Sequence, residues 1–183
     1  RVDIKNIDWV AVAILTSYHL ALLIALPLYL YFSSPSMGLI IAAIVLYLLS
    51  GIGITSGYHR LYSHRAYNIK KVVEPVILFL GTLAIENSVL KWAHDHRLHH
   101  RYVDTERDPY SIKKGFWHAH MLWIMKKGKG FDPAIVPDLM RNKLLVFQHK
   151  YYLPLVIATN LAVVLLCGWI LNDYAGAFVL TFL

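Results

Sequence analysis

Cysteine and charged residues are both scarce in this sequence. Cys167 is the single cysteine among 183 residues, so the chain can form neither an internal disulfide nor a zinc site built from several cysteines. Charged residues make up 16% of the chain and hydrophobic residues 57%, against about 45–50% apolar residues in soluble domains. The sequence also lacks internal repeats and low-complexity tracts. The composition therefore excludes a disulfide framework and an ordinary soluble domain.

The apolar residues that fill the chain indicate a membrane protein. The mean hydropathy is +0.49. The formal net charge is +7, and on so apolar a chain this excess favours anionic lipid headgroups or an acidic ligand as the partner. We therefore expect membrane lipid as a partner and no nucleic acid.

The apolar runs predict how the chain crosses the membrane. A spanning helix needs about 20 largely apolar residues. A shorter apolar run at 72–85 predicts a buried or interfacial helix, and the run at 175–183 is about half of a span. We expect one all-α domain of a four-span type, truncated in its fourth span, with a cap at residues 57–151. Three segments have the length of a complete span: residues 9–32, 37–56 and 152–171.

The basic residues predict which side of the membrane holds the cap. Of the 18 Lys and Arg residues, 16 fall between Arg60 and Lys150, and the other two precede the first span. Basic loops stay on the cytoplasmic side of a membrane. The N-terminus and the cap should therefore both be cytoplasmic.

Five of the ten histidines fall into two short patterns, "HRLYSH" and "HRLHH". His96, His99 and His100 have the spacing that places side chains on one face of an α-helix, so they should point to one locus. His59 and His64 are five residues apart, about 140° around an ideal α-helix. That angle is too wide for a tight chelate of one ion, and it favours two neighbouring ions.

The number of histidines narrows the metal chemistry. Neutral imidazole suits zinc, copper, iron and nickel alike. A structural zinc takes four ligands and a catalytic zinc three, so five clustered histidines exceed either need. The second pattern alone is also compatible with a solvated helix face or a phosphate-contacting helix. The first pattern, placed directly after a membrane span, favours a metal site. The remaining histidines in the cap should lie on the surface or behind the site: His94, His118, His120 and His149.

Residues 51–152 resemble the membrane fatty acid desaturases of the delta-nine, acyl-CoA type. The segments "GITSGYHRLYSHRAY", "ENSVLKWAHDHRLHHRYVDTERDPYSIKKGFWHAHMLW" and "FQHKYY" follow the order and spacing of that family. The resemblance implies four membrane spans under a cytosolic cap that holds two iron ions (Fe2+/Fe3+) among histidines. It also implies O2-dependent desaturation of a saturated fatty acyl chain, with electrons from a ferredoxin or a cytochrome b5.

The resemblance also assigns roles to individual residues. The metal ligands of the two histidine boxes would be His59, His64, His96, His99 and His100. Trp92 would line the bend of the acyl tunnel, and Asn87, Asp95 and Lys127 would contact the CoA head group. Glu86 and His94 depart from the Gln and Arg of the animal enzymes, and these differences leave acyl-lipid or acyl-carrier-protein substrates open.

Two other functions remain open from the sequence. Histidine-box membrane hydroxylases share this class of site, and a non-catalytic zinc-binding membrane scaffold would share the ligands. The family has a further histidine at the end of the fourth span and a third "HxxHH" box, both of which this sequence lacks. We therefore expect residues 1–183 alone to bind metal weakly and to be inactive.

Overall fold

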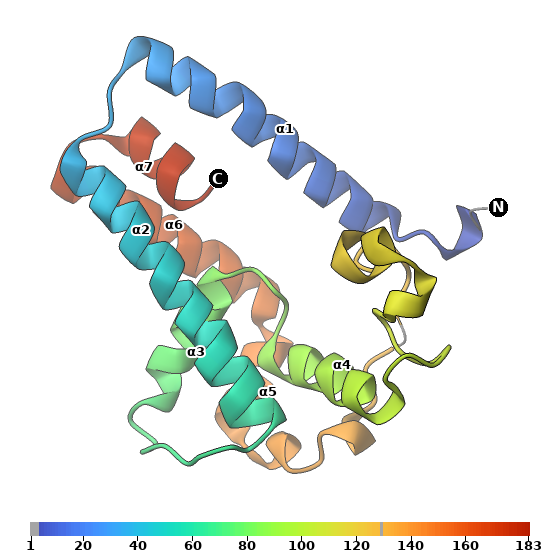
Figure 1. The fold of residues 1–183 in the computed structure, drawn as a ribbon. Coiled ribbons are helices and arrows are strands. Elements are labelled where there is room, and N and C mark those ends of the chain that lie inside the picture. Colours follow the sequence, from blue (N-terminus) through green and yellow to red (C-terminus); the bar gives the residue numbers. More distant parts are fainter. Residues whose placement is uncertain (1–3, 129) are drawn as a thin grey trace.

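Helices build all the regular structure in the described part of the chain, residues 4–128 and 130–183 of a computed structural model (Figure 1). Three of them are long and apolar enough to cross a membrane: α1 (Trp9–Phe32), a continuous helix over Met37–Ser63, and α6 (Tyr152–Leu171). The prediction of an all-α, multi-pass membrane protein is confirmed. The shorter helices are α3 (Glu74–Leu83), α4 (Val89–Tyr102), α5 (Lys143–Lys150) and α7 (Tyr174–Thr181).

Polar side chains cap the N-terminal ends of the first two spans. The Asp8 carboxylate accepts hydrogen bonds from the amides of Val10 and Ala11, both at 3.1 Å, and starts α1. After a short turn, the Ser36 side chain accepts the amide of Leu39 and starts α2 (Met37–Ile52). Within each helix the backbone bonds itself, as a bilayer requires.

The second span changes its helix type as it leaves the membrane. Beyond α2 the same helix continues as a π-helix, η2 (Gly53–Ser63). The sequence predicted that the span ends at residue 56, because the apolar run stops there, whereas the helix continues to Ser63. Gly53 lies at the junction, where a Cβ would meet the backbone nitrogen of Gly81 at 2.4 Å. The missing side chain therefore lets η2 pack directly on α3.

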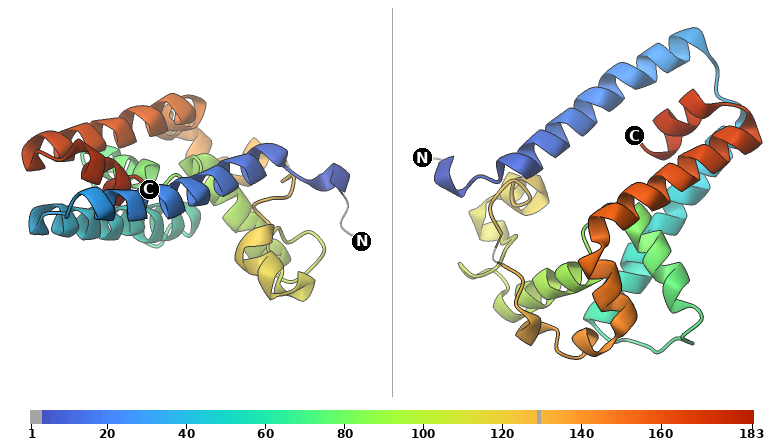
Figure 2. Two further views of the ribbon diagram at one scale, coloured as in Figure 1. Left: turned by 90° about the horizontal axis from the view of Figure 1, so that it is seen from above. Right: turned by 180° about the vertical axis from the view of Figure 1, so that it is seen from behind.

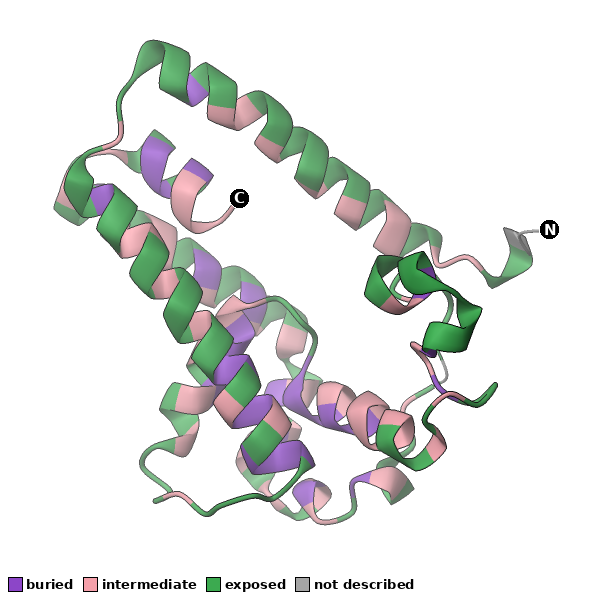
Figure 3. Ribbon diagram, viewed as in Figure 1, coloured by how far each residue is buried: buried purple, intermediate pink, exposed green. Residues whose placement is uncertain are grey.

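The core of the cap lies where η2, α3, α4 and α5 meet, and buried residues gather there (Figure 3). Tyr58, Leu90 and Leu145 are almost fully buried in it. Gln148 donates hydrogen bonds to the Tyr58 hydroxyl at 2.9 Å and to the Thr82 hydroxyl at 3.2 Å. This core supports the two helices that carry the histidines.

The N-terminal segment pairs with a part of the cap that is distant in sequence. The Asp8 amide donates to the carbonyl of Met125 at 2.9 Å, and the Lys127 amide donates to the carbonyl of Asn6 at 3.0 Å. Figures 1 and 2 show the segment around residues 112–127 against the N-terminal end of α1. The start of the first span and the cap therefore lie on the same side of the molecule.

A second polar contact joins the far ends of the spans. The Tyr29 hydroxyl donates to the Asp173 carboxylate at 2.5 Å, and Asp173 also caps α7 through the amide of Gly176. Helix α7 packs against α1, α2 and α6. It occupies Tyr174–Thr181 of the fourth apolar run.

Candidate metal centre

Four of the five predicted histidines converge on one point. One ring nitrogen from each of His59, His64, His96 and His100 lies within 4.8 Å of all the others. The Nε2 atom of His96 is 2.9 Å from that of His64 and 3.1 Å from that of His100. Bonds of about 2.0–2.1 Å to one ion hold neighbouring nitrogens roughly 3 Å apart. The four imidazoles therefore have the spacing of ligands that share an ion.

The π-helix brings the first two histidines together. At its C-terminal end, the backbone amide of His64 donates to the carbonyl of His59, five residues earlier. The Nε2 atoms of the two histidines are 3.0 Å apart. The predicted splay of about 140° is wrong, because it assumed the 3.6-residue period of an α-helix. The wider turn of η2 places residues five apart on the same face. His59 and His64 are therefore close enough to bind the same ion.

Helix α4 supplies the other half of the cluster with ordinary α-helical spacing. His96 and His100 are one turn apart and face the end of η2. Burial, and then the crowding of neighbouring imidazoles, lowers the pKa of His96 to about 3. Its ring is therefore neutral near pH 7, as a metal ligand must be.

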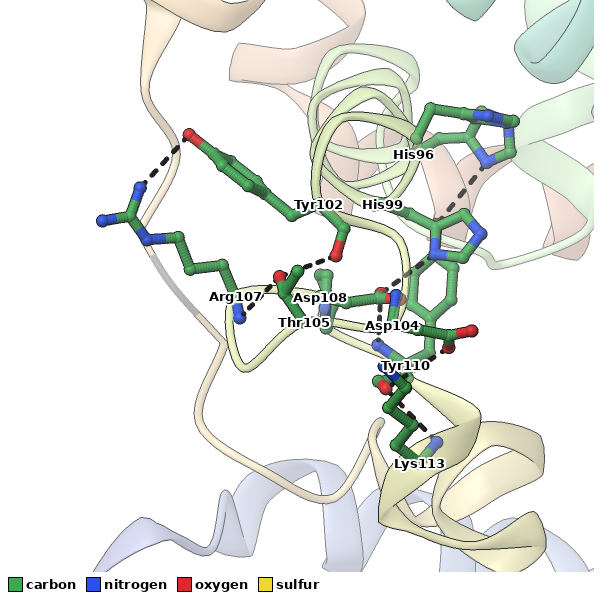
Figure 4. Close-up of polar contacts among 12 residues, drawn as sticks. His96, His99, Tyr102, Asp104, Thr105, Arg107, Asp108, Tyr110 and Lys113 are labelled. Atoms are coloured by element: carbon green, nitrogen blue, oxygen red, sulfur yellow. Dashed lines mark hydrogen bonds and ion pairs between the residues drawn. The ribbon is translucent and has the colours of Figure 1, made fainter.

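His99 lies apart from the four clustered nitrogens and has a carboxylate partner (Figure 4). Its Nδ1 atom is 2.9 Å from Asp108, and its ring packs on Tyr110 at 4.4 Å between centroids. A carboxylate on one nitrogen fixes the tautomer and leaves the Nε2 atom as the donor toward a metal. His99 therefore has the carboxylate partner typical of a metal ligand and lies outside the group of four.

Asp108 is buried and held from three directions. Besides His99, it accepts the amides of Asp104 at 2.9 Å and Tyr110 at 3.1 Å. Burial alone would raise the pKa of this carboxyl, but these hydrogen bonds outweigh it and hold the pKa below the ordinary value. Asp108 is thus an ionised buried acceptor. Sequence reasoning missed it, although metal-binding histidines usually have a carboxylate or carbonyl behind them.

Trp92 lies directly on the histidine cluster. Its ring stacks on His96 with 4.9 Å between centroids and meets His59 edge-on at 6.0 Å. Its indole N–H donates to the Glu86 carboxylate at 3.2 Å. Trp92 therefore joins the cluster to the turn between α3 and α4, where Glu86 and Asn87 lie.

The other three residues predicted to contact substrate lie in separate places. Asn87 has a positive φ of 84°, and its backbone N–H donates to the Tyr152 hydroxyl at 2.8 Å. Asp95 pairs with Lys91, at 2.6 Å from Nζ to Oδ1, and with the buried His94 at 2.8 Å. The Nζ atom of Lys127 donates to the carbonyl of Lys5 at 2.9 Å. Of the four residues predicted to contact substrate, Trp92 is the one whose ring packs on the clustered histidines.

The remaining cap histidines take different positions. His94 and His118 are buried, His149 is half-buried, and His120 is exposed and stacks on Phe116. His94 packs against Phe131, and its Nδ1 atom faces Asp95. The group of four converging histidines is made of His59, His64, His96 and His100, and that the other cap histidines lie on the surface or behind the site stays a prediction.

A cavity of about 870 Å³ opens among the spans beside this cluster. Mostly apolar side chains of α1, α2, α6 and the end of the chain line it, together with the turn at residues 83–86. Glu86 belongs to that lining and also bonds to Trp92. The volume lies in the range of small-molecule sites, about 300–1,000 Å³. An apolar space among the spanning helices therefore reaches Glu86, the hydrogen-bond partner of the tryptophan that stacks on His96.

Three helices with the length and composition of membrane spans, and four histidines that converge where the second of these helices meets α4, define a helical membrane protein with a candidate metal centre. The model of the fatty acid desaturase family matches residues 33–183. The chain belongs to the fatty acid desaturase family.

Curated proteins similar to this chain come from fungi, insects and a nematode. A probable acyl-CoA desaturase of Schizosaccharomyces pombe is 42% identical over 169 residues, which cover 87% of this chain and 35% of that protein. An acyl-CoA Delta-9 desaturase of Acheta domesticus is 39% identical over 83% of this chain and 43% of its own length. An acyl-CoA Delta(11) desaturase of Trichoplusia ni is 38% identical, covering 75% and 40%. The chain therefore spans less than half the length of these relatives.

Proposed function

We propose that this protein carries out O2-dependent desaturation of a saturated fatty acyl chain at a histidine-ligated centre of two iron ions. The observation that carries this proposal is the convergence of four imidazoles at the polar end of the spans. The family and the names of its similar proteins support the same reaction.

The five histidines divide between the two ions. His59, His64, His96 and His100 would hold one iron, because their nitrogens already surround one point. His99, backed by Asp108, would bind the neighbouring iron. Imidazole donors fit iron, and iron supplies the O2-dependent oxidation that removing hydrogens from an unactivated methylene needs.

The apolar cavity would hold the acyl chain. Each CH2 that leaves water contributes about 0.8 kcal/mol, so a long saturated chain binds well in an apolar space. Trp92 and Glu86 lie between the cavity and the histidines, where a bend would present one pair of carbons to the metal. We propose acyl-CoA of the delta-nine type as substrate, with Asn87, Asp95 and Lys127 contacting its head group.

The centre would face the cytoplasm and take electrons from a ferredoxin or a cytochrome b5. Sixteen of the 18 basic residues lie between Arg60 and Lys150, which supports a cytoplasmic cap. The pairing of residue 6 with residue 127 supports an N-terminus on the same side. Cysteine labelling at Lys114 from each side of sealed vesicles tests this orientation, and labelling from the outer face alone would reverse it.

Lipid analysis tests the reaction. The complete gene is expressed in a desaturase-deficient host, and the acyl chains are analysed by mass spectrometry. A new cis alkene is the expected product, and its position identifies the regiospecificity. An alcohol in its place would indicate a hydroxylase. Stoichiometric zinc, with no O2 consumption, would indicate a scaffold and overturn the proposal.

A further inference from the structure

Arg97 connects the two elements that carry the clustered histidines. It follows His96 directly on α4, and its guanidinium reaches the end of η2, next to His64. Its Nε atom donates to the carbonyl of Ser63 at 3.1 Å, and Nη2 donates to the carbonyl of Tyr62 at 2.8 Å. One side chain therefore bonds the backbone that leads immediately into His64.

The remaining contacts of Arg97 anchor it on a third segment. Nη1 and Nη2 donate to the two carboxylate oxygens of Asp138 at 2.6 and 3.0 Å, and Nη1 also donates to the carbonyl of Ile135 at 3.3 Å. A guanidinium has five N–H groups. Five acceptors thus surround Arg97, two on η2 and three on residues 135–138. The whole donor set is used in one fixed orientation.

These bonds meet a need that is specific to a helix end. The last carbonyls of a helix have no partner within the helix and take one from a side chain or from water. The Arg97 side chain is only 20% exposed, and the Asp138 carboxylate beside it 18%. In this half-buried place the guanidinium serves as the partner for Tyr62 and Ser63. The direction in which η2 ends therefore depends on Arg97.

We propose that Arg97 is a positioning residue that holds the π-helix pair, His59 and His64, at the correct distance from the α4 pair, His96 and His100. The inference rests on the proposed metal site and adds the element that sets its geometry. Without the guanidinium, the end of η2 shifts relative to α4, and the four nitrogens no longer meet at one point. The metal then loses affinity and changes its ligand field.

Lysine cannot replace arginine in this role. Its ammonium is a compact charge with three donors, whereas the planar guanidinium spans a carboxylate and two carbonyls at once. Arg97→Lys keeps the charge beside Asp138 but loses the forked contact with Tyr62 and Ser63. The substitution therefore separates geometry from charge.

Arg65→Lys is the matched control. Arg65 also pairs with Asp138, at 3.4 Å, but its side chain is 70% exposed, and no hydrogen bond to η2 is among its contacts in the described chain. Exposed pairs of this kind contribute little. Arg65→Lys should leave metal binding within about twofold of the wild type, because less than 1 kcal/mol is at stake.

The experiment titrates the purified full-length protein, stripped of metal, with Co2+ and records the visible absorption bands, which report ligand geometry. Arg97→Lys should weaken Co2+ binding by about 10–100-fold, as loss of outer-sphere support does, and should shift the bands. Thermal unfolding of the metal-free protein is measured in parallel. Arg97→Ala, if it folds, should recover part of the affinity on addition of millimolar guanidinium.

The outcomes separate the two proposals. If the wild type does not bind Co2+ through histidine, the proposed metal site fails. If the wild type binds but Arg97→Lys has unchanged affinity and unchanged bands, the positioning role is wrong, whatever its unfolding temperature. If Arg97→Lys does not fold, Arg97→Gln replaces it, since it also removes the forked contact with Tyr62 and Ser63, and unchanged affinity and bands there overturn the role equally.

Discussion

The two arms of the histidine cluster, η2 with His59 and His64 and α4 with His96 and His100, share one buried core but add different contacts to it. The η2 arm adds very close packing: Gly53 and Gly57 let it lie directly against α3, where added Cβ atoms would approach Gly81 and Ile77 to 2.4 Å. The α4 arm adds charged hydrogen bonds, including those from Arg97 to the end of η2. Its contacts are ion pairs and carboxylate–histidine pairs, through Lys91, Asp95, Arg97, His99 and their partners.

The difference follows from where each arm lies. The η2 arm continues a membrane span and keeps the close helix packing of small residues found inside membranes. The α4 arm lies outside the spans, and charged side chains there are partly solvated. Small apolar changes should therefore damage the first arm, and changes of charge or pH the second.

Removal of a shared ligand should affect both arms most strongly. His96 approaches the nitrogens of both His64 and His100, so His96→Ala leaves the ion without its central ligand. We expect loss of product and of tight iron binding, by more than about 100-fold, with membrane insertion intact, because the ligand lies outside the spans. Iron per protein and product yield measure this. His120→Ala, in an exposed histidine, is the control, and equal losses in both would refute the ligand assignment.

A change of charge should damage only the α4 arm. Asp108→Asn keeps the shape but removes the negative charge that orients His99. We expect affinity for the second iron to fall about 10–100-fold, so that iron content drops from two toward one. Metal analysis after dialysis against a weak chelator checks this. Retention of two irons would mean that His99 does not depend on Asp108.

A single methyl group should damage only the η2 arm. In Gly53→Ala the new Cβ meets backbone atoms of Leu80 and Gly81 at 2.4–2.6 Å, and a backbone cannot rotate away. We expect a loss of about 1–3 kcal/mol in unfolding free energy. Gly51→Ala, two residues earlier, has no atom within 4 Å of its Cβ and should be neutral. Equal unfolding temperatures for the two variants in detergent would contradict the packing argument.

Acid should have the smallest effect on the free energy of unfolding. It should act on a contact of the α4 arm, the pair formed by Arg97 and Asp138. The hydrogen bond from Arg97 holds the pKa of Asp138 below its ordinary value. The folded state therefore binds fewer protons than the unfolded state, and stability is present above about pH 4 and lost as the pH falls below it. Asp138→Asn should flatten part of this decline. The measurement is thermal unfolding between pH 3 and 6 for both proteins, and parallel curves would exclude Asp138 as a source.

The sequence predicts best the features that depend on one segment alone. The first and third spans, 9–32 and 152–171, match α1 and α6, since long apolar runs need no tertiary information. The short apolar helix at 72–85 contains α3. The shared face of His96 and His100 also follows from their spacing on α4.

The sequence predicts poorly the features that depend on contact between segments. The π-helix was missed, and so was the close packing of its Gly53 and Gly57 on α3, because the contact involves a second segment of the chain. Arg97 and Asp138 are 41 residues apart, and no local pattern pairs them. Asp108 was also missed, although it lies only nine residues after His99.

The pairing of the N-terminal segment with residues 125–127 dictates an order of assembly. During synthesis, residue 6 leaves the ribosome long before residue 127, and the two close a loop of about 120 residues, which carries a large entropic cost. Because the contact joins residues that are so far apart in the chain, we expect closure of the cap against the first span to come late in folding.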